Sequence, residues 1–207
     1  MNKRNKYYLW MILLLLFLCV GCGNSNIGNT EESNHTGKVE ETQETEFYVE
    51  IVDAKEVLVK TWESYAEEDR FEIMGGHFDS AVMGMPEKYD LTQVTDLVQM
   101  YCVPEAQIEN LDDGATMIDL YNAGRFMASA FHVNDGANVD EVVSQMHTQI
   151  MENQWHGEKP QKLMIVKIDE QYVISVWGRE SLVDKFREKL ESVYQEMIVV
   201  MVEEKNF

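Results

Sequence analysis

The hydrophobic positions of the chain divide it into three parts with different patterns. An uncharged and mostly apolar run occupies Tyr7 to Val20, a polar stretch follows, and periodic apolar positions return from about residue 47. In the last part, apolar spacings of three and four residues alternate with short runs rich in β-branched and aromatic residues. The first pattern is typical of amphipathic helices and the second of strands. Residues 47–207 are therefore predicted to form a single domain with both helices and strands.

Four helices are predicted in this domain. Apolar positions follow one face of each helix, and residues that cap or stop helices mark their ends. These markers are Asp53 with Glu56, Pro104 after a helix over about Leu91–Cys102, Asn138 with Glu141, and Ser181. The periodicity of the last helix continues through Met197–Val202. We expect this run to be helical, with a strand as the alternative.

Strands are predicted between these helices. Ile108–Leu120 is expected to be strand-like around a turn at Asp112–Gly114, and Arg125–Val133 has the composition of a buried strand. Leu163–Ile168 and Tyr172–Trp177 flank a short turn and form the strongest hairpin pattern of the chain. The order is then α-α-β-β-α-β-β-α. Because helices recur between pairs of strands, we predict an α+β fold, with an antiparallel or mixed sheet of about four strands and helices packed on it.

The first 21 residues have the organisation of a removable export signal. Three basic residues and no acid precede the uncharged run, which as a helix spans roughly 21 Å against a hydrocarbon core of about 30 Å. This length suits the central region of a signal peptide. Leu18–Cys22 then resembles the bacterial lipobox, although Cys19 stands where leucine is usual. The resemblance implies that Cys22 is lipidated and becomes the mature N-terminus, with an ordinary cleaved signal or a short uncleaved anchor as alternatives.

Residues 22–46 are predicted to form a disordered acidic spacer. Ile27 and Val39 are their only sizeable apolar residues, so this stretch cannot bury enough apolar surface to offset the entropy lost on ordering. The whole chain has a formal net charge of −20, and loss of the signal would remove three further basic residues. Nucleic acid is therefore disfavoured as a partner, because its binding needs Lys and Arg. The expected partners are the membrane, reached through Cys22, and an envelope protein or small ligand.

Cysteine chemistry gives one candidate site in the predicted domain. Cys19 leaves with the signal and Cys22 is lipidated, so only Cys102 remains and no intramolecular disulfide is expected. A thiol can act as a nucleophile beside a histidine base. The possible partners are His77, His132, His147 and His156. No local catalytic signature surrounds Cys102, and a buried inert cysteine on an apolar helix stripe is the favoured interpretation.

Oxygen-rich turns are the candidates for metal binding. Asn134–Glu141 and Asp112-Asp113 carry several carboxylates and amides, but the first fails the spacing of a calcium-binding EF-hand loop. A turn followed by a helix cap uses the same residues and is favoured. The histidines of the domain also lack zinc-binding spacing. We therefore predict no metal site, no cofactor and no catalytic residue.

Three further segments are candidates for ligand contact. Met74–Asp79 contains paired glycines that let backbone approach a ligand, although a tight turn is favoured. Trp155–Gly157 and Trp177-Gly178 place aromatic residues at the ends of elements. Tryptophans in such places form recognition patches, for example for a sugar or a peptide, when they are accessible to solvent. The more common alternative is an aromatic at the edge of the core.

Residues 105–195 are similar to small uncharacterised lipoproteins of Gram-positive bacteria that carry a domain of unknown function. The similarity rests on a strand at Ala128–Val133, an acidic capped helix beginning Val139-Asp140-Glu141-Val142, a strand hairpin, and a closing helix that includes Phe186. That family has no assigned activity, so the resemblance implies a lipoprotein setting and no catalytic residue.

Two functions follow from these patterns. The first is a non-catalytic binding or accessory module, anchored by lipid on the outer face of the cell membrane. The second is a cell-surface hydrolase whose site lacks a recognisable motif. Stabilisation by a bound divalent cation ranks below both. The lipobox favours the first, because a lipid-anchored domain on a spacer needs no activity of its own to act at the envelope.

Replacing Cys22 by Ala is expected to abolish incorporation of labelled palmitate and to move the chain out of the membrane fraction. Two acyl chains anchor a protein stably, at about 0.8 kcal/mol per buried methylene. Cys19→Ala is the matched control and should retain both properties. If the Cys22→Ala chain stays wholly in the membrane fraction, the apolar run anchors it without cleavage.

Overall fold

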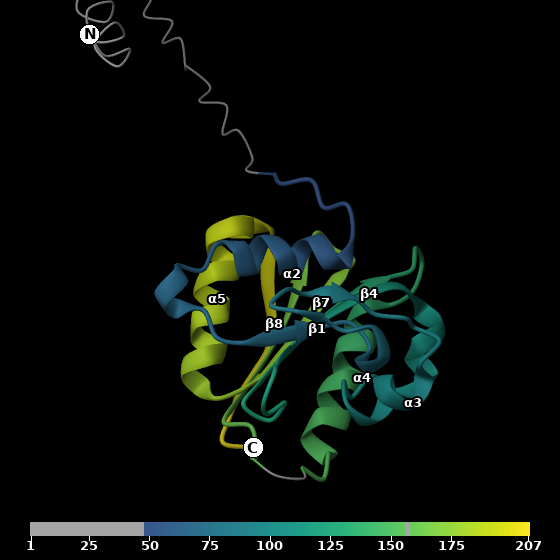
Figure 1. Cartoon of the computed structure of the whole chain (residues 1–207). Helices are drawn as coiled ribbons and strands as arrows, with labels where there is room; N and C mark the ends of the chain where they lie inside the picture. The colour runs from purple at the N-terminus through teal and green to yellow at the C-terminus, as the bar shows by residue number, and fades with distance from the viewer. Residues whose placement is uncertain (1–47, 156–157) are drawn as a thin grey trace, which may run out of the picture. The chain divides into compact units, whose positions relative to one another are not determined.

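The computed structural model describes residues 48–155 and 158–207. Within them one antiparallel sheet of eight strands carries helices on both faces (Figure 1). The strand order is β2-β1-β4-β5-β7-β6-β8, and β3 pairs with β4 outside this path. The α+β class agrees with the sequence, but the prediction of about four strands is wrong. The signal, Cys22 and the predicted spacer up to residue 46 lie outside the described residues.

The strands and helices have the following bounds. The strands are β1 (Ile73–Gly75), β2 (Val82–Met83), β3 (Glu87–Lys88), β4 (Leu111–Asp119), β5 (Phe126–Val133), β6 (Lys162–Ile168), β7 (Tyr172–Gly178) and β8 (Ile198–Lys205). The α-helices of the described part are α2 (Ala54–Glu63), α3 (Val94–Gln99), α4 (Val139–Glu152) and α5 (Glu180–Tyr194). Short 3-10 helices are η1 (Glu67–Asp69), η2 (Phe78–Ser80), η3 (Glu105–Asn110) and η4 (Gln195–Met197). None of these helices is long and apolar enough to cross a membrane.

The centre of the sheet follows the sequence closely. β5, β6 and β7 occupy the predicted strand positions, and β6 and β7 form the predicted hairpin. The turn predicted at Asp112–Gly114 is wrong, because β4 runs through it as one strand. A β-bulge between Leu111 and Asp113 absorbs one extra residue while the pairing with β5 continues. Asp112 and Asp113, the polar residues that suggested a turn, lie at this bulge.

The four additional strands have two different causes. β1, β2 and β3 are each only two or three residues long, so they are too short to show a period. The continued helix predicted through Met197–Val202 is wrong, because this run enters β8. Gln195 has a φ of 44°, a left-handed conformation that ends α5. β8 then pairs with the otherwise open edge of β6, and this pairing outweighs the helical spacing.

Helix ends show where local chemistry decides structure. The carboxylate of Asp53 accepts a hydrogen bond from the Glu56 amide, and the amide oxygen of Asn138 accepts one from Glu141, so both predicted caps are confirmed. Ser181 is not a cap, because α5 begins one residue earlier, after Arg179.

The second predicted helix is shorter than Leu91–Cys102. Asp90 accepts hydrogen bonds from the amide and hydroxyl of Thr92. These bonds hold residues 90–92, just before α3, in a turn. Cys102 has a φ of 53°, so the helix cannot include it. Only Val94–Gln99 remains as α3.

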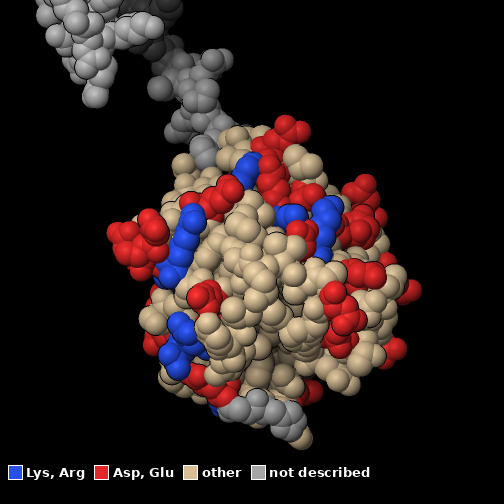
Figure 2. All heavy atoms as spheres, in the orientation of Figure 1, with Lys and Arg blue, Asp and Glu red and all other residues tan. Residues whose placement is uncertain are grey.

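The sheet separates two hydrophobic clusters. Ala128 and Ala130 of β5 point to the side of α2 and α5, whereas Met127 and Phe131 point to the side of α4. This alternation follows from the two-residue period of a strand. In Figure 1, α5 and α4 lie on opposite sides of the strands. Figure 2 shows the charged side chains spread around the rim of the visible face, with an uncharged area near its centre.

Three buried hydroxyls in neighbouring strands provide a stability test. Thr116 accepts a hydrogen bond from the Gly76 amide at 3.0 Å, whereas the hydroxyls of Ser129 and Ser175 have no hydrogen-bond partner within the described residues. Ser175→Ala is expected to raise the free energy of unfolding by about 1 kcal/mol, because it removes a desolvated group that makes no bond. Thr116→Val should lower it by about 1–2 kcal/mol, because it leaves a buried amide unpaired. Urea unfolding measures both, and a destabilised Ser175→Ala chain would contradict the assignment.

Candidate functional site

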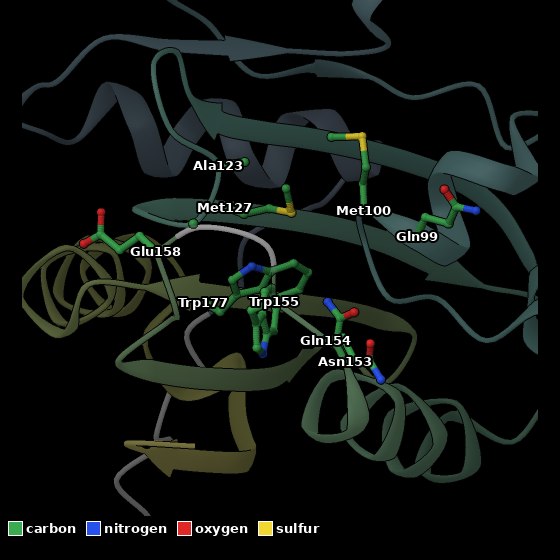
Figure 3. Close-up of a pocket in the computed structure, with 10 residues that line it drawn as sticks. Gln99, Met100, Ala123, Met127, Asn153, Gln154, Trp155, Glu158 and Trp177 are labelled. Atoms are coloured by element: carbon green, nitrogen blue, oxygen red, sulfur yellow. The ribbon is translucent and has the colours of Figure 1, made fainter.

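A pocket of about 470 Å³ lies where α3, the end of α4 and the ends of β5 and β7 meet (Figure 3). We call it the Trp pocket. Its lining combines aromatic rings, thioethers and amides, chiefly Trp155, Trp177, Met100, Met127, Gln99 and Gln154. This composition is typical of ligand sites, in which an apolar lining carries a few polar groups that orient the ligand.

The two tryptophans come from different elements and meet at this pocket. Their ring centroids are 5.8 Å apart and their planes differ by 62°, an edge-to-face arrangement. Trp177 is only 1% exposed and belongs to the core on the α4 side, so for this residue the core interpretation is correct. Trp155 is half-buried and follows the end of α4. Its ring also packs near the ring of Phe207, with 6.3 Å between the two ring centroids. Trp155 is therefore the aromatic ring that a ligand can reach.

The register of the sheet determines what lies beneath these rings. Met127 of β5 stands directly opposite Trp177 of β7. Both side chains point to the α4 side, and Figure 3 shows Met127 next to the tryptophan pair. His156 and Gly157, which the sequence grouped with Trp155, lie outside the described residues.

A second hollow of about 590 Å³ adjoins the first and shares Asn153 and Gln154 with it. We call it the amide pocket. Gln145, Gln149 and Asn153 line it at intervals of four residues along and just beyond α4. This interval places side chains on one side of a helix. The two pockets therefore share one border, at the C-terminal end of α4.

The amide groups of this row are oriented by the protein. Gln149 donates to the carbonyl oxygen of Val98 at 3.1 Å, Asn153 donates to the Cys102 sulfur at 3.4 Å, and Gln145 donates to Glu141 at 3.0 Å. In each case the side-chain nitrogen is engaged. Within the described residues no protein donor binds the three side-chain oxygens, so they are available as acceptors.

Glu158 is the charged residue among the described residues that line the Trp pocket, and both of its carboxylate oxygens accept hydrogen bonds. Arg179 donates to them at 2.7 and 3.2 Å, and Asn122 donates at 3.0 Å. Hydrogen bonding from Arg179 holds the pKa of Glu158 below its ordinary value, so the carboxylate is ionised and compensated at neutral pH. A side chain at Gly124 would approach the Glu158 carbonyl oxygen to 2.3 Å, so glycine is required at this contact.

Cys102 is not assembled into a nucleophilic site with the described histidines. Burial raises the pKa of its thiol to about 12, so the thiol is protonated at neutral pH. The described histidines lie beside carboxylates instead: His77 near Asp96, His132 near Asp112, and His147 near Glu204. His156 falls outside the described residues.

The oxygen-rich turns are occupied by structural hydrogen bonds. Asp135 accepts from Gln171 at 2.7 Å, and Asn138 caps α4. Asp113 accepts from the backbone amide of Ala54 at the start of α2, and Asp112 lies 2.6 Å from His132. Within residues 48–155 and 158–207, no group of three or more His, Cys, Asp or Glu side chains gathers in a way that could hold a metal ion.

The paired glycines of Met74–Asp79 serve packing and a turn. Met74 and Gly75 belong to β1, and a side chain at Gly75 would approach the Glu87 amide to 2.3 Å. Glycine therefore allows β3 to approach β1 closely. Gly76 has a φ of 83°, which favours glycine, and begins the turn toward His77.

Comparison of the chain with protein-family models, with curated protein sequences and with solved structures gives no match in any of the three. The resemblance to small lipoproteins of Gram-positive bacteria therefore stays a prediction.

The environment of Cys102 predicts a thiol that resists modification. The test uses the chain with Cys22→Ala and Cys19→Ala, in which Cys102 is the remaining thiol. At pH 8 the folded chain should react with a thiol-specific reagent roughly a hundredfold more slowly than the same chain in denaturant. The thiolate is the reactive form, and burial of Cys102 in the folded chain disfavours it. Absorbance of the released chromophore measures this difference. Fast stoichiometric reaction of the folded chain would contradict this prediction and would support Cys102 as a nucleophile.

Proposed function

We propose that the protein is a lipid-anchored, extracytoplasmic and non-catalytic binding module, and that its ligand occupies the Trp pocket and the amide pocket. The observation that carries the proposal is the convergence of Trp155, with its reachable ring, and a row of amide acceptors at one end of α4. This is recognition chemistry, because these groups stack and form hydrogen bonds but do not transfer protons near neutral pH.

The location rests on the sequence. A basic start, a short apolar run and the lipobox-like Leu18–Cys22 support lipidation at Cys22 on the outer face of the membrane. A diacylated Cys22 followed by a polar spacer would hold the folded residues close to the envelope while leaving their surface free. A binding role fits this arrangement, because the anchor confines the site to one compartment.

The volumes of the two pockets are large enough for a small-molecule ligand. Each pocket lies within the range of roughly 300–1,000 Å³ that is usual for small-molecule sites. The hydrolase alternative loses support in its cysteine version, because the Cys102 thiol is buried and accepts a hydrogen bond from Asn153.

Binding to isolated cell envelopes tests the function. The chain with Cys22→Ala, which cannot take a lipid at that position, is mixed with membrane and wall fragments from cells that produce the protein, and the bound fraction is measured after sedimentation. Trp155→Ala is expected to weaken binding about tenfold, which corresponds to roughly 1.4 kcal/mol for one aromatic contact.

Tyr48→Ala is the matched control. Tyr48 is an exposed aromatic whose hydroxyl contacts Asp169, at the end of the β6–β7 hairpin remote from Trp177, so this variant should bind normally. Equal binding by the Trp155→Ala and Tyr48→Ala chains, or no binding by the parent chain, would overturn the proposal. Thermal unfolding midpoints of both variants verify that each is folded.

A further inference from the structure

We propose that the two adjoining pockets bind a neutral oligosaccharide of N-acetylated sugars, which extends from Trp155 past Asn153 and along α4. This inference rests on the proposed function and specifies the ligand of the same site. Four properties of the pockets favour this class of ligand: their charge, their aromatic surface, their free amides and their combined length.

The charge of the described lining disfavours an anionic ligand. Among the described residues no Lys or Arg lines either pocket, and the acids that line them are Glu152 and Glu158. Glu158 is already paired with Arg179, so it offers no free charge. A phosphate-bearing or carboxylate-rich polymer would meet no Lys or Arg of the described lining that is free of a carboxylate partner, on a chain of net charge −20. Glu152, which is exposed in the amide pocket, adds one carboxylate, so the described lining favours a ligand without negative charge.

The aromatic surface suits a sugar ring. One face of a pyranose presents C–H groups, whereas its rim carries hydroxyls. An apolar face of this kind packs on an indole ring, and Trp155 is half-buried with its ring at the Trp pocket. Met100 and Met127 add apolar surface to the same pocket, and Figure 3 shows Met127 next to the tryptophan pair. Thioethers adapt their shape to an acetamido methyl group.

The free amides suit an acetamido group. Gln99 and Gln154 are exposed at the Trp pocket and make no side-chain hydrogen bond within the described residues. A primary amide offers both N–H donors and a carbonyl acceptor. An acetamido group offers one of each, so the two can pair. The side-chain oxygens of Gln149 and Asn153 then remain to accept bonds from sugar hydroxyls along the amide pocket.

The combined length favours a chain of several sugars. The pockets share Asn153 and Gln154, and the amide pocket continues along α4 toward Gln145. A ligand that occupies both pockets would therefore need more than one ring.

An extended peptide is the main alternative ligand, and it commonly binds by adding a strand to a sheet edge. Among the described strands, β2 and β8 are the ends of the main strand path, and neither contributes a residue to the lining of these pockets. The available hydrogen-bonding groups are side-chain amides instead. A glycan fits them better, because its hydroxyls and acetamido groups project at intervals around each ring.

Titration with defined oligosaccharides tests the inference. The Cys22→Ala chain is titrated with chitotetraose, a neutral tetramer of N-acetylglucosamine, and with cellotetraose, which has the same backbone but hydroxyls in place of the acetamido groups. Calorimetry and tryptophan fluorescence report binding. Chitotetraose is expected to bind at least tenfold more tightly than cellotetraose and than the N-acetylglucosamine monomer.

Variants place the ligand in the two pockets. Trp155→Ala should weaken chitotetraose binding about tenfold, Trp155→Phe should restore part of that loss, and Gln154→Ala should reduce the preference over cellotetraose. Tyr48→Ala should bind as the parent does. The Phe variant keeps the test valid if the Ala variant is poorly folded.

Failure of the inference is distinguishable from failure of the proposed function. If chitotetraose does not bind while envelope binding still depends on Trp155, the function stands and the glycan assignment is wrong. Equal affinity for chitotetraose and cellotetraose overturns the acetamido assignment. If an uncharged tetraalanine peptide with blocked ends, rather than chitotetraose, displaces the chain from envelopes, the ligand is a peptide. Chitotetraose binding unaffected by Trp155→Ala and Gln154→Ala overturns the location.

Discussion

β5 is hydrogen-bonded to a strand along both of its edges, and nearly all of its residues are buried. Because neither face is free, each side chain must match the layer that it meets. Ala128 and Ala130 leave room for α2 to lie against the sheet, while Phe131 fills the α4 side. The same pairing sets Met127 opposite Trp177, which positions the floor of the Trp pocket. The candidate site thus depends on the register of the central strands.

The outer edge of the sheet depends on a buried charge. Lys162 of β6 is only 4% exposed at its side chain, and its ammonium lies 2.5 Å from Asp184 of α5 and 2.6 Å from Glu203 of β8. A buried ammonium without partners would be costly, so the two carboxylates hold α5 and β8 against β6. β8 in turn leads to Phe207, whose ring contacts Trp155. The aromatic group of the site is therefore supported from the sheet edge as well as from α4.

The chemistry of the site differs from that of the surrounding surface. Most of the acidic excess lies on exposed positions and in ion pairs, whereas the two pockets present amides, indole rings and thioethers. Two of the titratable groups that line them are restrained, since Glu158 is paired with Arg179 and the Cys102 thiol is buried, whereas Glu152 is exposed. We propose that such a lining binds its ligand mainly through shape and hydrogen-bonding pattern. On a chain proposed to be tethered at Cys22, it supports selective binding at the envelope.

The sequence by itself determined what local chemistry decides: the caps at Asp53 and Asn138, the β6–β7 hairpin, and the α+β class. It also singled out Trp155 and Trp177, each as an aromatic at the end of an element. Only the tertiary structure decided the eight-stranded sheet and the strand that begins at Ile198 within the run Met197–Val202, which was expected to be helical. β8 gains its hydrogen bonds from β6, whose residues come well before it in the chain. The sequence also did not predict that the two tryptophans and the amides of α4 line adjoining pockets. This arrangement depends on strand register and helix packing. Both bring together residues that are far apart in the sequence, so the local pattern around each residue does not indicate the other.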